Sequence, residues 1–133
     1  LQTVRAMDPM KAKHLDKALM QFAEEGAAKV FKPAIGSGFI VGVVGALQFD
    51  VLASRIEQEY QLPVRFEPTQ FTSARWVSGA KEAVEKFVAA NKGHMATDSD
   101  GDAVYMTRLQ WDIDRAVRDY PDVRLTATKE MMV

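Results

Sequence analysis

The sequence contains no cysteine, which excludes a disulfide-stapled scaffold, a thiol nucleophile and any zinc or iron–sulfur site built on thiolates. It also lacks an excess of charge. Seventeen Lys and Arg residues face eighteen Asp and Glu residues, so the net charge of −1 gives no positive field toward nucleic acid or membrane. No apolar run approaches the roughly 20 residues that span a bilayer, and no signal-peptide pattern opens the chain. These absences predict a soluble, cytoplasmic protein that does not associate with membranes.

The 133 residues, of which 47% are hydrophobic and 26% charged, fit one ordinary globular domain. The chain starts at Leu1 rather than Met, inside a segment with strand character. We therefore expect residues 1–133 to be a single domain of something longer.

The first half of the chain alternates between strand and helix patterns. A strand over 1–7 precedes a helix that Asp8 and Pro9 begin and Gly26 ends. Strands follow over 28–33 and 38–45, the second so apolar that we place it centrally in a sheet. A helix over about 46–61, with one apolar face, and a strand over 64–67 complete the order βαββαβ. This order predicts an α+β, ferredoxin-like fold with its helices packed on one sheet face.

The second half predicts further strands and two helices, roughly βαβαβ. Ser78 is in position to cap the first helix, and Thr107 with Gln110 has the spacing of a capping box for the second. The last helix has the apolar stripe Leu109, Ile113, Ala116, Val117 and Tyr120, and a strand over 123–128 follows. No internal repeat of 20–50 residues is evident.

Two loops have compositions that resemble ligand sites. Counting from Asp98, an EF-hand would need Gly sixth and Glu twelfth, where Ala103 and Leu109 stand. We therefore interpret residues 98–102 as a solvated turn with Gly101 in a left-handed conformation. Gly36, Ser37 and Gly38 lack the third glycine of a dinucleotide fingerprint and precede a strand, so we interpret them as turn residues. No metal or cofactor site is predicted.

Catalytic signatures are also scarce. His14 is expected on a helix surface. His94 lies near Ser99 and three aspartates, but sequence proximity does not establish a nucleophile–base–acid triad. A hydrolase using His94 and Ser99 stays the weakest of the alternatives, and we assign no catalytic residue.

Three residues are candidates for a contact surface. Arg75 and Trp76 end a strand of mixed polarity, where an arginine beside a tryptophan can bind RNA, although a core Trp76 is the favoured interpretation. Trp111 falls opposite the apolar stripe of the last helix, and an exposed tryptophan often marks a contact with a partner or a neighbouring domain.

The segments GVVGALQFDVLASRIEQEY (42–60) and PVRFEPTQFTSARWV (63–77) closely resemble the C-terminal domain of peptide chain release factor 3, a bacterial translational GTPase family. The opening DPMKAKHLDKALMQFAEEGAAKVFKP (8–33) is also similar. The resemblance implies an α+β domain that contacts the ribosome and packs against the family's own G and β-barrel domains. By the resemblance, Phe49, Ile56 and Tyr60 are core positions, and Gln48, Asp50 and Arg55 lie off the core face.

The family's parent protein hydrolyses GTP and promotes departure of class I release factors from the ribosome. GTP and Mg would be bound by the G domain, which this chain lacks, so the resemblance implies a noncatalytic part without a cofactor of its own. Arg75, Trp76 and Trp111 are its candidate ribosome or interdomain contacts. The alternative from another class is a ferredoxin-like regulatory module that binds a small molecule.

Overall fold

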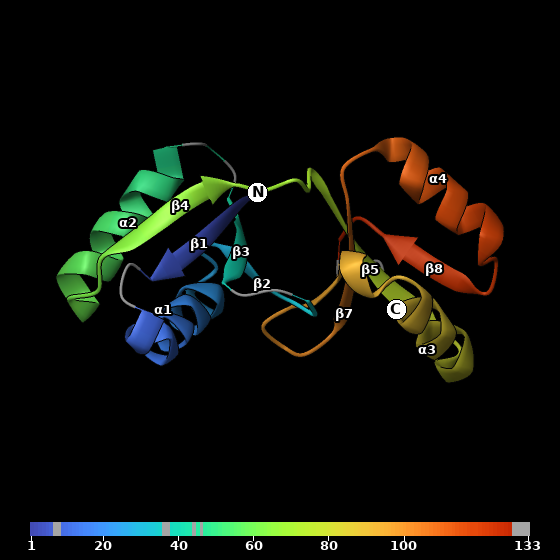
Figure 1. Cartoon of the computed structure of the whole chain (residues 1–133), viewed down its shortest axis with the longest axis horizontal. Helices are drawn as coiled ribbons and strands as arrows, with labels where there is room; N and C mark the ends of the chain where they lie inside the picture. The colour runs from blue at the N-terminus through green and yellow to red at the C-terminus, as the bar shows by residue number, and fades with distance from the viewer. Residues whose placement is uncertain (7–8, 36–37, 44, 46, 129–133) are drawn as a thin grey trace. The chain divides into compact units, whose positions relative to one another are not determined.

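The computed structural model describes residues 1–6, 9–35, 38–43, 45 and 47–128 (Figure 1). Its contacts divide the chain into two compact units. Unit 1 holds residues 1–32 and the chain from Gly38 to Thr69, and unit 2 holds Pro33–Ile35 and the chain from Gln70 onward. The expectation of a single domain over 1–133 stays a prediction.

Unit 1 has the order that the sequence predicts. Its elements are β1 (Gln2–Ala6), the short 3-10 helix η1 (Pro9–Lys11), α1 (Ala12–Glu25), β2 (Lys29–Pro33), β3 (Phe39–Gly42), α2 (Leu47–Tyr60) and β4 (Val64–Pro68). The strand order is β4-β1-β3-β2, with each of these pairings antiparallel. The prediction of a central β3 is confirmed, and so is the ferredoxin-like arrangement.

Both helices of unit 1 share one core with its sheet. The buried members come from α1, α2, the strands and two connecting segments: Val4, Leu15, Ala18, Leu19, Phe22, Ala28, Val30, Val41, Phe49, Leu52, Ile56 and Leu62. Gly26 ends α1 with a φ of 77°, a left-handed conformation that glycine adopts without a Cβ penalty. The N-cap prediction for Asp8 lies outside the described residues, and η1 begins at Pro9.

An arginine links the two helices of unit 1. Arg55 of α2 donates to Glu25 of α1 at 3.0 Å, pairs with Glu59 at 3.4 Å, and stands 4.5 Å over the ring of Phe22. The hydrogen bond to Glu25 raises the pKa of Arg55 further, and the charges of Glu25 and Glu59 act in the same direction against partial desolvation. Tyr60 also donates its hydroxyl to Gln21. Polar side chains thus link α1 to α2 at the protein surface.

Unit 2 repeats the order of unit 1, which corrects the predicted βαβαβ. Its elements are β5 (Ser73–Gly79), α3 (Lys81–Ala90), the 3-10 helix η2 (Lys92–His94), β6 (Met95–Thr97), β7 (Ala103–Thr107), α4 (Gln110–Asp119) and β8 (Val123–Thr126). The strand order β6-β7-β5-β8 is that of unit 1 in reverse. The sequence pattern missed β6 because three residues are too few to show alternation.

The core of unit 2 includes a cluster of three aromatic rings. The fully buried Phe87 of α3 packs edge-on against Tyr105 and Tyr120, each with 5.0 Å between ring centroids. Burial raises the pKa of Tyr105, with the charge of Asp112 and the nearby Tyr120 adding to the effect and Arg115 opposing it. Val77, Met95, Ala116 and Val123 are buried in the same cluster.

Both helix starts of unit 2 differ from prediction. Ser78 lies inside β5, and α3 is capped by Ala80 without a side-chain hydrogen bond. Thr107 lies inside β7, where its buried hydroxyl has no partner among the described residues, and Leu109 takes the N-cap position of α4. Ser78 and Thr107, which the sequence pattern predicted as helix caps, are instead paired in strands. Leu109 and Val117 are 54% and 50% exposed, so only part of the predicted apolar stripe is buried.

The two units also share short, similar sequence motifs at matching elements. Leu47-Gln48-Phe49-Asp50 opens α2, and Leu109-Gln110-Trp111-Asp112 stands at the start of α4. A tyrosine closes each helix, Tyr60 and Tyr120, and the sequences VRF (64–66) and VRL (123–125) begin the strands that follow. The matching segments lie 62, 60 and 59 residues apart, beyond the period of 20–50 residues in which no repeat is evident.

Candidate functional site

Trp111 is the candidate contact residue that the structure places at the surface. It lies in the first turn of α4 with 59% of its area exposed, as its position opposite the apolar stripe predicts. The guanidinium of Arg115, one helical turn later, stands 5.1 Å from its ring centroid. That distance is within the range of a cation–π interaction. Sequence analysis missed Arg115, although its spacing of four residues from Trp111 was visible.

The sequence counterpart of Trp111 in unit 1 is not exposed. Phe49 of α2 is buried, and its ring centroid lies 5.3 Å from that of Phe66. The two helices also differ in length, because α2 has 14 residues and α4 has 10, with Leu109 and Tyr120 at its caps. The same motif position is therefore buried in unit 1 and exposed in unit 2.

Arg75 and Trp76 point to opposite faces of β5, because successive strand side chains alternate. Arg75 is half-buried and donates to the carbonyl of Ala74 at 2.9 Å. Trp76 is 4% exposed, and its indole N–H donates to Asp98 Oδ2 at 2.9 Å. The favoured interpretation of Trp76 as a buried residue is confirmed. The contact roles of Arg75, Trp76 and Trp111 stay predictions.

Asp98 organises the loop between β6 and β7. Its Oδ1 accepts the backbone N–H groups of Asp100 and Asp102, each at 2.9 Å, and Gly101 has a φ of 88°. The predicted left-handed turn is therefore confirmed. Ligand atoms of the three aspartates lie within 4.8 Å of one another, close enough to share a cation. The hydrogen bonds to the backbone and to Trp76 account for the turn without one.

The two histidines lie in different environments, and neither is paired with a carboxylate among the described contacts. His14 is exposed on α1, as predicted. His94 Nδ1 lies 3.1 Å from the carbonyl oxygen of Met106, and its ring contacts Phe71 and Tyr105. A catalytic triad needs a carboxylate at that nitrogen, and a main-chain carbonyl stands there instead.

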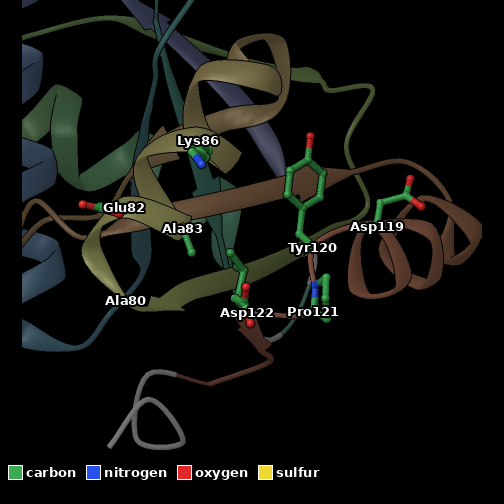
Figure 2. A pocket seen from close by; sticks show the side chains of 9 residues that line it. Ala80, Glu82, Ala83, Lys86, Asp119, Tyr120, Pro121 and Asp122 are labelled. Carbon is green, nitrogen blue, oxygen red and sulfur yellow. The ribbon is translucent and has the colours of Figure 1, made fainter.

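Unit 2 also has a groove of about 460 Å³ that the sequence did not suggest. Figure 2 shows its two sides: Glu82, Ala83 and Lys86 come from α3, and Tyr120 and Asp122 from the turn that leads into β8. A smaller hollow of about 380 Å³ follows over Gly79 and Arg124. Sequence periodicity did not predict this groove, because its lining residues come from α3, from the end of α4 and from the turn before β8.

The turn predicted at Gly36 and Ser37 lies outside the described residues, while Gly38 has a φ of 82°. No α-helix within the described ranges is both long and apolar enough to cross a membrane. Gln48 and Asp50 are exposed, so the prediction that they lie off the core face is confirmed, whereas Arg55 is half-buried over the core residue Phe22.

Comparison with family models identifies the family of the chain. Residues 1–117 match the class II release factor RF3, C-terminal domain, so the chain belongs to this family. The match covers all of unit 1 and extends into α4 of unit 2, including Arg75, Trp76 and Trp111. The resemblance that the sequence motifs indicated is confirmed.

Proposed function

We propose, from its membership of the RF3 C-terminal domain family, that this chain is the noncatalytic, ribosome-contacting part of a translational GTPase. The parent protein would act in termination by promoting departure of class I release factors, in the cytoplasm where ribosomes work. GTP and Mg would belong to a G domain elsewhere in that protein. The family match over residues 1–117 is the observation that carries this proposal.

The proposal assigns the described residues a docking role. Arg55 and Glu25 link the two helices of unit 1, and Asp98 fixes the loop beside Trp76. These charged groups therefore stabilise the fold. Trp111 is different, because a large ring is held in the open beside an arginine. Exposed aromatic residues of this kind are enriched at contacts. The contact would be made by unit 2, with the parent's G and β-barrel domains as further partners.

A binding experiment with ribosomes tests the proposal. With a net charge of −1, the chain alone should bind weakly, because phosphate contacts supply most nonspecific affinity for RNA. We expect poor co-sedimentation even at low salt, together with lysine crosslinks to the ribosome that excess unlabelled chain suppresses. Absence of competable crosslinks would contradict ribosome contact. Tight, salt-resistant sedimentation would contradict the charge argument.

The groove between α3 and the turn before β8 favours a second candidate, a regulatory module that binds a small molecule. Its volume of about 460 Å³ is within the range of small-molecule sites. Such a module would show a ligand-dependent rise in melting temperature across a metabolite panel. The ribosome-contacting domain would show none.

A further inference from the structure

We infer that the α4 platform, formed by Trp111, Arg115 and Arg118, stacks on an unpaired RNA base. This inference rests on the proposed ribosome contact and names the chemistry of that contact. The three residues are four and three positions apart, so they share one face of α4. The Trp111 ring is 59% exposed, and the side chains of Arg115 and Arg118 are 55% and 73% exposed.

The geometry suits a flat aromatic ligand. Arg115 lies 5.1 Å from the centroid of the Trp111 ring, so two planar groups already associate on the helix surface. Bases of single-stranded RNA stack on aromatic rings and on guanidinium planes, and every base offers a π-face. The ring faces solvent, whereas Phe49 at the matching place in α2 is a core residue.

The charged groups of this face can meet a phosphate, although two aspartates balance the two arginines. Asp114 accepts from Gln110, and Asp119 makes exposed pairs at 3.9 Å with Arg115 and 3.6 Å with Arg118. Exposed pairs of this kind stabilise little, so a phosphate can replace the carboxylate. Charged side chains flank the ring on this face, whereas the exposed apolar Leu109 and Val117 of this region lie off it.

The test uses the whole chain and two labelled RNAs of equal length, one unpaired and one duplex, with binding read by anisotropy and tryptophan emission. We expect the unpaired RNA to quench the emission and to bind more tightly than the duplex. Trp111→Ala should weaken binding roughly tenfold, and Trp111→Phe should restore part of it. With two arginines meeting phosphate, affinity should fall only about sevenfold between 50 and 200 mM salt.

Controls separate stacking from other contacts. Trp111→Phe leaves Trp76 as the only tryptophan, and its emission should not respond to RNA. Leu109→Ala removes a comparably exposed apolar side chain off the platform and should leave RNA binding unchanged. Trp111→Leu keeps apolar area without a ring, and binding as tight as the original would overturn the inference.

Parallel experiments with ribosomes distinguish the two proposals. Ribosome crosslinks that Trp111→Ala abolishes, in a chain that binds neither RNA, would identify a protein partner and overturn the RNA inference alone. Crosslinks that Trp111→Ala leaves intact would also overturn it. If ribosomes give no competable crosslinks at all, the proposed function fails with it.

Discussion

Unit 1 and unit 2 reach the same βαββαβ topology by different means. In unit 1 the ring of Phe22 lies in the shared core and Arg55 stands over it, joining α2 to Glu25 of α1. In unit 2 the core centres on Phe87 and two tyrosines, and Asp98 ties the β6–β7 loop to Trp76. Topology is therefore set by the pattern of strands and helices, while the stabilising contacts differ between the units.

The surfaces differ at one matching position. A similar four-residue motif stands at the start of α2 and α4, but its aromatic residue is buried in unit 1, as Phe49, and exposed in unit 2, as Trp111. Unit 1 illustrates the packed form of the motif, and unit 2 the exposed form.

The largest expected effect comes from the aromatic core of unit 2. Phe87→Ala should lower the free energy of unfolding by about 3–5 kcal/mol, because a fully buried ring with two edge-on partners is replaced by a cavity. Urea unfolding monitored by circular dichroism measures the change. Phe22→Ala, which empties an equally buried site in unit 1, is the matched variant. A loss below about 1 kcal/mol at Phe87 would mean that its surroundings collapse to fill the site.

A smaller effect is expected at the β6–β7 loop. Asp98→Ala removes the acceptor of three hydrogen bonds and should cost about 2 kcal/mol, with a shift in Trp76 emission. Asp98→Asn keeps an oxygen for the two backbone donors and should cost about half as much. Equal costs for both variants in urea unfolding would show that the bond to Trp76, rather than the turn, dominates.

In unit 1, Arg55→Ala should lower the urea midpoint slightly, because the ion pairs lie at a solvated surface. The loss should shrink in 1 M salt, since exposed charges are screened. Arg65→Ala, on the more exposed pair with Glu67, is the control and should change the midpoint less. A salt-independent loss at Arg55 would assign its effect to packing on Phe22 instead.

The smallest effect at neutral pH concerns Tyr105. Its pKa is raised from 10.0 by burial, so folding favours the neutral phenol. The resulting stability is fully present below about pH 10 and is lost as pH rises through the folded pKa. Tyr105→Phe should therefore flatten the fall in unfolding free energy above pH 10, measured by urea titrations at several pH values. An unchanged slope would contradict the assignment to Tyr105.

The sequence predicts unit 1 better than unit 2 because its apolar patterns are long. The 14-residue α2 shows four turns of periodicity, and its buried Phe49, Leu52 and Ile56 follow the predicted stripe. In unit 2 the three-residue β6 leaves no pattern, and strand pairing overrides the capping signals of Ser78 and Thr107.

The candidate surface could be predicted only in part. Helical spacing sufficed to place Trp111 off the core. The proximity of Arg115 depends on a side-chain conformation, and the bond from Trp76 to Asp98 joins residues 22 positions apart. The groove depends on how α3 and the turn before β8 pack together. Such tertiary contacts leave no local periodicity in the sequence.

We propose above that this family domain docks a translational GTPase on the ribosome. The most direct test measures how fast class I release factors leave terminated ribosomes with the longer protein that carries this chain, and with a version lacking residues 1–133. We predict that the shortened protein still binds GTP but no longer accelerates departure. Full acceleration without these residues would contradict the claim.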